Sequence, residues 1–232
     1  INDPTHVLDK NITLSDKFAM EFVMKHLVED HGLTRINFIG GFPGNLQTEE
    51  RLAGYKKVLA EHNIPVEERR IAYGQFWTKA ADCTREFLKD ELPQAIVCAN
   101  DTMAIFCMDE LKHQGYSIPK DIIVTGFDGI ADCELYSPTV TTVRRSFAEA
   151  GEKAVDMLSD MWQGREVPDW VDVVSVLEKA ESCGCVKKEP QEESYYNSTY
   201  QTKDTFMEFT VKLTEMNTAF AGCRTSEEVY EA

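Results

Sequence analysis

The sequence predicts an α/β fold in which a Rossmann-like parallel sheet is flanked by helices. Two observations support this prediction. Short apolar runs alternate with longer segments of helical periodicity through the first 185 residues, and this alternation is typical of βαβ units. The chain is also 43% hydrophobic over 232 residues, which is enough to build a packed core.

The predicted strands are short and apolar, as expected for strands that are buried on both faces. They are expected at residues 35–39, 70–73, 95–98, 122–124, 140–143 and 170–177. The intervening helices carry apolar side chains on one face, and several stop at a glycine. They are expected at residues 16–29, 48–62, 78–90, 102–114 and 147–163, with Ser15 as the N-cap of the first.

Polar and aromatic residues follow several of these strands. Right-handed crossovers place the carboxyl ends of the strands at one edge, where open α/β sheets bind ligands. Asn and Asp grip adjacent hydroxyls, Arg donates in a fork, and an aromatic ring covers the apolar face of a sugar. The predicted site for a sugar-like small molecule consists of Arg51, Phe76 or Trp77, Asn100 and Asp128.

Each of these residues also has a purely structural interpretation. The asparagine and the aspartate are common turn residues, and the arginine alone is typical of a solvated helix charge. The two aromatic rings could instead pack in a local core. Asp101 directly precedes a predicted helix and is expected to be its N-cap rather than a ligand contact. The functional interpretation depends on the convergence of the set at one edge.

Several functional classes find little support in the sequence. The net charge of −16 argues against direct contact with nucleic acid or an acidic membrane, and no run of eighteen apolar residues is present. Residues 40–44 are glycine-rich but fit neither common nucleotide-binding pattern, and no nucleophile elbow occurs. An enzyme is therefore the least favoured class, and no cofactor is expected.

The seven cysteines predict a reduced, cytoplasmic protein. Most lie in or beside apolar segments, where a free thiol behaves as a small hydrophobe. Cys183 and Cys185 form a Cys-x-Cys pair, but two further ligands at a zinc-like spacing are not evident nearby. None of the five histidines falls at the predicted binding edge. No metal site is therefore predicted.

Four motifs resemble the effector domain of the lac/galactose repressor family. They occupy residues 51–55, 98–104, 118–128 and 137–143, and the similarity extends over residues 14–177. The resemblance implies a periplasmic-binding-protein-like type I fold, whose two Rossmann-like lobes close on a small molecule that is often a sugar.

The same resemblance assigns effector contacts to individual residues. It implies contacts from Arg51, Phe76, Asn100 and Asp128, with Phe147 near a crossover between the lobes. Trp77 adjoins the family's aromatic position, which aligns better with Phe76.

The resemblance also implies an incomplete sensor domain over residues 1–185. Residues 14–144 correspond to the C-terminal lobe, and the helix at 147–164 belongs to an N-terminal lobe that this chain otherwise lacks. An apolar face of that helix is expected to be exposed unless it packs elsewhere or pairs between chains.

A polar linker at residues 186–203 and a helix at 204–232 are expected to follow. Apolar residues of that helix form an a/d seam over two heptads, at Phe206, Phe209, Leu213, Met216 and Phe220. The seam predicts a dimeric coiled coil, although a helix docked on its own domain would show a similar stripe.

Residues 181–185, followed by the linker and the heptad helix, resemble receptors whose sensor is joined to a downstream signalling output. Diguanylate cyclases are one such class. The sequence therefore favours a cytoplasmic ligand-sensing module of a homodimeric signalling protein. The alternative is the effector domain of a lac-repressor-type DNA-binding regulator whose DNA-reading segment lies elsewhere.

Overall fold

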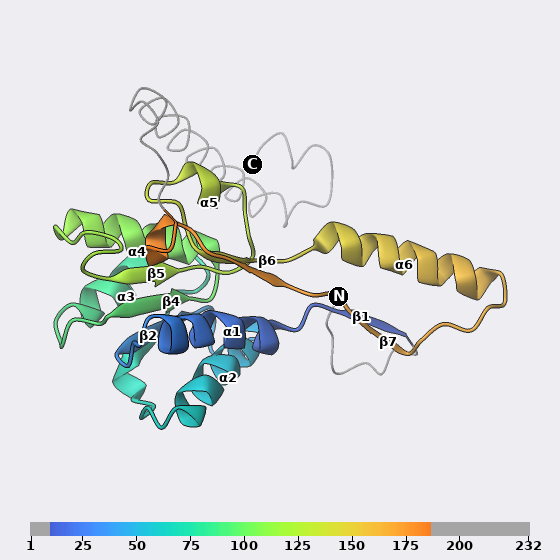
Figure 1. Ribbon diagram of the computed structural model, residues 1–232, viewed down its shortest axis with the longest axis horizontal. Coiled ribbons are helices and arrows are strands. Elements are labelled where there is room, and N and C mark those ends of the chain that lie inside the picture. Colours follow the sequence, from blue (N-terminus) through green and yellow to red (C-terminus); the bar gives the residue numbers. More distant parts are fainter. Residues whose placement is uncertain (1–9, 187–232) are drawn as a thin grey trace, which may run out of the picture. The chain divides into compact units, whose positions relative to one another are not determined.

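The structure is a computed structural model that describes residues 10–186. Its central sheet has four parallel strands (Figure 1), in the order β3 (Ile71–Tyr73), β2 (Ile36–Gly40), β4 (Ala95–Cys98) and β5 (Ile123–Thr125). Strands β2 and β4 are buried along their whole length, because helices cover both faces of the sheet. The predicted α/β fold is confirmed.

Four helices cover the sheet. Two of them, α1 (Asp16–Lys25) and α2 (Leu46–Glu61), pack together on one face, and α3 (Lys79–Phe87) and α4 (Asp101–His113) pack on the other (Figure 1). The chain moves outward from β2 to β3 and then returns past β2 to β4. Right-handed crossovers therefore place α2 and α3 on opposite faces. This reversal makes the carboxyl ends of β2 and β4 the expected ligand crevice.

Two short sheets flank this core. Strand β6 (Thr142–Arg144) pairs antiparallel with β8 (Val176–Glu178), and β1 (Asn11–Thr13) pairs parallel with β7 (Trp170–Asp172). The prediction of a single strand over residues 170–177 is wrong, because its two halves pair with different partners in separate sheets. The amino-acid pattern is suitable for a strand throughout, so only pairing reveals the break.

The sequence predicts the N-cap residue of one helix correctly and misplaces that of another. Ser15 is the N-cap of α1 as predicted, although its side chain makes no capping hydrogen bond within the described residues. The prediction that Asp101 caps α4 is wrong by one residue. Asn100 has the extended backbone of a cap, and its Oδ1 accepts from the Met103 amide at 2.9 Å. Asn and Asp cap helices about equally well, so local sequence does not separate them.

Several short elements are additional to the predicted ones. The first helix continues beyond α1 as a π-helical turn, η1 (His26–Asp30). Two 3-10 turns, η2 (Glu68–Arg70) and η3 (Glu181–Cys183), and the four-residue helix α5 (Asp132–Leu135) complete the described part of the chain apart from its last helix.

The last helix, α6 (Phe147–Trp162), confirms a predicted element and its exposure. It contacts β1 beyond the carboxyl ends of the sheet strands (Figure 1). None of its residues is buried among the described part of the chain. Large apolar side chains are exposed along it, at Phe147, Val155, Leu158, Met161 and Trp162.

The predicted heptad helix at 204–232, and the linker at 186–203 apart from its first residue, lie outside the described residues. Within the described range, no helix combines the length and the apolar character needed to cross a membrane.

Candidate functional site

A buried arginine organises the carboxyl edge of the sheet. Arg51 lies in α2 and is 1% exposed, so its interpretation as a solvated helix charge is wrong. Its Nη1 donates to the carbonyl oxygen of Ala99, directly after β4. Its guanidinium also lies 4.0 Å from the centroid of the Phe127 ring, where the flat cation and the ring attract each other. The side chain thus bridges α2 to the loops after two neighbouring strands.

Arg51 belongs to a cluster of four charges. Its Nη2 lies 3.3 Å from Oδ2 of Asp16 and 3.2 Å from Oδ1 of Asp128. Arg145 contacts the same two carboxylates, at 3.2 Å and 3.5 Å. Two cations and two anions cancel, which makes the burial of these charges tolerable. Nε of Arg51 and Nε of Arg145 have no hydrogen-bond partner among the described residues.

Asp128 is the member of this cluster that reaches solvent. Its side chain is 28% exposed, whereas the side chains of Arg51, Asp16 and Arg145 are at most 6% exposed. Burial raises the pKa of Asp128, and the two arginines partly oppose that rise. Both arginine contacts use Oδ1, so Oδ2 takes part in neither and can accept a hydrogen bond from outside the cluster.

Asn100 and Phe76 meet at the crevice between β2 and β4. Besides capping α4, the Asn100 amide donates to the carbonyl oxygen of Phe76 at 3.3 Å. Phe76 has a left-handed backbone, with φ of +61°, and its ring lies 6.0 Å from that of Phe42. A Cβ at Gly41 would lie 2.0 Å from the Phe76 ring, so glycine is required for the ring to lie over this loop.

The remaining two predicted site residues differ in their relation to the cluster. Phe147, at the start of α6, is 59% exposed, and the Arg145 guanidinium lies 4.9 Å from its ring centroid. Phe147 therefore places an aromatic ring of α6 next to the charged cluster. Trp77 is 41% exposed and pairs with the Phe106 ring of α4 at 6.0 Å, so among the described residues its ring contact is with α4.

Two residues of this edge are additional to the predicted set. Asp16 follows the Ser15 cap, and Arg145 follows β6, whose Arg144 forms an isolated bridge with Asp128 after β5. The strand-end rule that selects Asp128 would also select Arg145 if residues 140–143 are counted as part of the sheet. Nothing local in the sequence distinguishes Asp16 from an ordinary acidic residue in the first turn of a helix.

Asp101 supports the loop that carries Asp128. Its carboxylate accepts from the Thr142 hydroxyl at 2.5 Å and from the Ile130 amide at 2.9 Å. Burial raises the pKa of Asp101 to about 6, although these two hydrogen bonds favour the ionised form. The residue ties the start of α4 to β6, and so it positions the binding edge without facing it.

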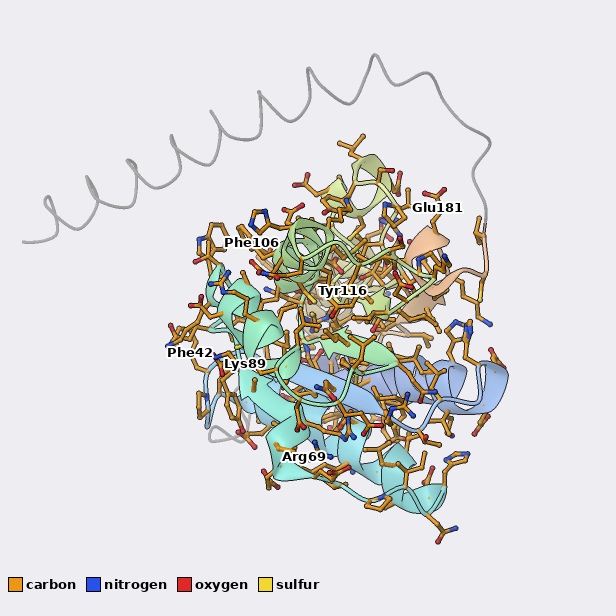
Figure 2. The ribbon with its side chains drawn as sticks, turned by 90° about the vertical axis from the view of Figure 1, so that its left-hand side faces the viewer. Phe42, Arg69, Lys89, Phe106, Tyr116 and Glu181 are labelled. Atoms are coloured by element: carbon orange, nitrogen blue, oxygen red, sulfur yellow. The ribbon has the colours of Figure 1, made fainter. Side chains whose placement is uncertain are left out.

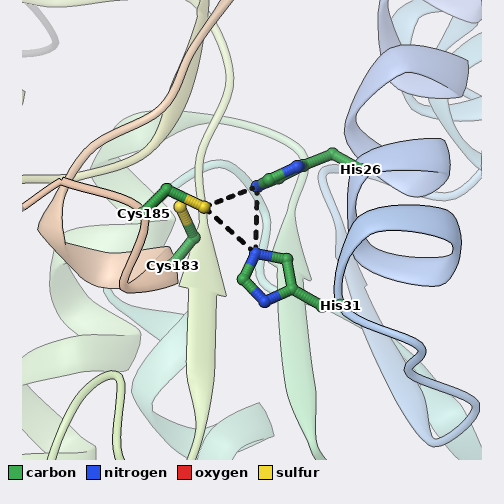
Figure 3. Close-up of side chains that lie close together, drawn as sticks. All are labelled: His26, His31, Cys183 and Cys185. Atoms are coloured by element: carbon green, nitrogen blue, oxygen red, sulfur yellow. Dashed lines mark hydrogen bonds between the residues drawn. The ribbon is translucent and has the colours of Figure 1, made fainter.

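A second group of side chains lies at the opposite end of the sheet. Figure 2 is viewed from this end, with Lys89 and Tyr116 in the connections before β4 and β5 and with Glu181 after β8. The group consists of His26, His31, Cys183 and Cys185 (Figure 3). The structure therefore places two histidines beside the Cys-x-Cys pair, for which the sequence offered no further ligands at a zinc-like spacing. Both histidines are remote in sequence from the cysteines, so spacing rules could not find them.

The fold and the edge geometry agree with comparisons to known proteins. A family model described as the periplasmic binding protein-like domain matches residues 24–183, and the chain belongs to this family. Within it, the chain is an effector-binding domain of the lac repressor type, as its motifs indicate.

Three individual proteins illustrate the similarity. The arabinose metabolism transcriptional repressor of Geobacillus stearothermophilus is 35% identical over 158 residues, which cover 64% of this chain and 43% of the repressor. A solved Escherichia coli structure, a sugar-binding transcriptional regulator of the LacI family complexed with phosphate, is 28% identical. Its TM-score is 0.70, and the match covers 74% of this chain and 62% of that chain.

The lac repressor dimer bound to operator and the anti-inducer ONPF is 27% identical, with a TM-score of 0.68 over 74% of this chain and 59% of that chain. The chain spans less than half the length of the Geobacillus repressor that it matches.

Proposed function

We propose that this chain is the effector-binding part of a cytoplasmic transcriptional regulator of the lac repressor type, and that it binds a sugar-like molecule. The relatives reported above are transcriptional repressors or regulators. They support the DNA-binding alternative rather than a diguanylate cyclase output. The strongly acidic chain would not itself touch DNA, so DNA contact would come from another part of the regulator.

The arrangement of Asp128 is the observation that carries this proposal. Two arginines hold Oδ1 of its carboxylate, while the group is partly open to solvent at the carboxyl edge of β5. A carboxylate fixed in this way is preorganised to accept hydrogen bonds from ligand hydroxyls through its other oxygen. Phe76, which contacts Asn100, and Phe147, which contacts Arg145, would supply apolar surfaces for the C–H faces of a sugar ring.

Arg51 acts in this proposal chiefly through Asp128. Its Nη1 and Nη2 already bind the Ala99 carbonyl and two carboxylates, and its Nε is buried, so direct contact with a ligand would require the side chain to rearrange. Asn100 similarly uses its Oδ1 as a helix cap and has its amide nitrogen near the crevice. The direct ligand contacts proposed are therefore Asp128, the Asn100 amide and the aromatic rings.

The exposed face of α6 fits the same proposal. A two-lobed sensor needs a second wall for its crevice, and the apolar side chains of α6 lie unburied beside the edge that would be closed. In the full regulator this face would pack on a second lobe, and ligand-biased closure of the lobes would alter the assembly of a homodimer. Repression or induction would follow from that shift.

A thermal-shift screen on the full-length protein tests the proposal. Arabinose, other monosaccharides, disaccharides and nucleosides are the probes, compared for the wild type, Asp128→Asn and the matched control Asp90→Asn. Asp90 is an exposed aspartate paired with Arg69 at the opposite end of the sheet. A sugar should raise the melting temperature of the wild type and the control, and Asp128→Asn should weaken its binding about tenfold or more. A shift that survives both Asp128→Asn and Asn100→Ala would place the pocket elsewhere.

A further inference from the structure

Two imidazoles and two thiols converge at the amino end of the sheet. Their nearest ligand atoms all lie within 4.8 Å of one another. Nε2 of His31 is 3.2 Å from Nε2 of His26 and 3.2 Å from Sγ of Cys185, and Sγ of Cys185 is 3.6 Å from Nε2 of His26 (Figure 3). Cys183 completes the group from the end of η3.

The three distances among His26, His31 and Cys185 lie close to the edges of a tetrahedral metal site. Zinc binds imidazole nitrogen at about 2.0–2.1 Å and thiolate sulfur at about 2.3 Å, so its ligand atoms lie about 3.3–3.8 Å apart. Ordinary hydrogen bonding explains the cluster less well. A ring nitrogen carries either a proton or a lone pair, so the three mutual contacts among the two imidazole nitrogens and Sγ of Cys185 cannot all be hydrogen bonds at once, whereas one cation satisfies all three atoms.

The surroundings of His26 resemble the outer shell of a metal site. Its Nδ1 lies 2.7 Å from Oδ2 of Asp30, and Lys179 donates to the same oxygen at 2.8 Å. A carboxylate on the far nitrogen fixes the orientation of the ring and leaves Nε2 unprotonated for a metal. His26 and Cys183 are buried, His31 is partly buried and Cys185 is exposed, so a metal would have a route of entry.

We propose that His26, His31, Cys183 and Cys185 form a structural zinc site. Four protein ligands close the coordination sphere, which distinguishes structural from catalytic zinc, and a mixed set of two sulfurs and two nitrogens suits zinc better than magnesium or calcium. The site joins the end of the first helix to the turn after β8, between segments separated by 154 residues at His31 and Cys185. It fixes the C-terminal end of the described domain against α1, and it does not depend on the proposed function.

The experiment measures zinc in the full chain, purified without a histidine tag in reducing buffer after growth with zinc. Elemental analysis should find about one zinc per chain. The variants Cys185→Ser and His31→Ala remove the two more accessible ligands, and each should weaken zinc binding at least about tenfold. His113→Ala, an exposed histidine on α4, is the matched control and should retain zinc.

Cobalt provides a readout that does not depend on the folding of any variant. Chelator-stripped wild-type protein reloaded with Co²⁺ should show the visible bands of tetrahedral cobalt and a near-ultraviolet thiolate charge-transfer band. Folded wild-type protein that binds neither zinc nor cobalt would overturn the proposal. Full zinc retention in the double variant of Cys185→Ser and His31→Ala would overturn it as well. A disulfide between Cys183 and Cys185 that persists in reducing buffer would have the same consequence.

Discussion

The two ends of the central sheet solve the problem of burying polar side chains in different ways. At the carboxyl end, two arginines and two aspartates neutralise one another, and one carboxylate remains partly open. At the amino end, imidazoles and thiols face one another without matching charges. The first arrangement is complete in the protein alone, and its open carboxylate is the ligand contact that we propose. The second would be completed by the zinc ion that we propose.

Because ion pairs hold one end and a cluster of imidazoles and thiols lies at the other, the two ends should respond to different perturbations. Ion pairs at the carboxyl end should be sensitive to substitution of either charge and to pH. The cluster at the amino end should be sensitive to chelators. Because the two ends share no residues, their effects on the free energy of unfolding should be additive.

Among substitutions at the two ends of the sheet, Arg51→Met is expected to cost the most stability. The substitution leaves Asp16 and Asp128 with a single cation in a buried setting, and loss of one partner of a buried ion pair costs about 3–5 kcal/mol. Denaturant unfolding measures the change. Arg165→Met is the control, because Arg165 pairs with Asp160 at an exposed position and should cost less than about 1 kcal/mol. Similar losses in both variants would contradict the view that the carboxyl end is held by its ion pairs.

A pH series on Asp101→Asn should give the next largest effect. The pKa of Asp101 rises from 3.8 to about 6 on folding, so the folded state holds the proton more tightly than the unfolded chain. Its contribution to stability is fully present below about pH 4 and is lost as pH rises through about 6. This change amounts to about 3 kcal/mol.

Asp101→Asn removes this titration. The stability of the variant relative to the wild type should therefore rise between pH 4 and pH 7, whatever its constant offset from the altered hydrogen bonds. Unfolding free energies of both proteins across that range provide the measurement. A difference that does not vary with pH would show that Asp101 ionises normally in the folded state.

Asn100 allows the structural and binding roles of one residue to be separated. Asn100→Ala removes the cap on the Met103 amide and should cost about 1 kcal/mol of stability. Asn100→Asp keeps a capping oxygen but loses the amide donor, so its stability should stay near that of the wild type while sugar binding weakens. Unfolding curves and ligand titrations of both variants separate the two roles. Unimpaired binding in Asn100→Asp would assign the residue to the helix alone.

The smallest effect is expected on α6. Leu158 is 64% exposed, so Leu158→Glu should change the free energy of unfolding of this chain by less than about 0.5 kcal/mol. Leu59→Glu, at a leucine that is 2% exposed in α2, is the contrasting variant and should unfold the domain. A large loss from Leu158→Glu would mean that the face of α6 is already covered in solution.

Much of the architecture could be read from local patterns, and the reason is physical. Buried parallel strands must be short and apolar, and their crossover helices must carry one apolar face, so the βα alternation and the edge with Asn100 and Asp128 follow from residues near in sequence. The Cys98–Asn100 turn and the loop to Asp128 are local features of this kind. The choice of Asn100 over Asp101 as cap is not, because both residue types serve that role.

The remaining features depend on contacts between segments that are far apart in the sequence. Arg51 is buried because Asp16, Asp128 and Arg145 arrive from three other segments, and no single segment carries that information. The strand expected at residues 170–177 is divided because its first half pairs with β1 and its second half pairs with β6. His26 and His31 lie beside Cys183 and Cys185 only because β8 runs antiparallel to β6 and returns the chain to the amino end of the sheet, next to the end of the first helix.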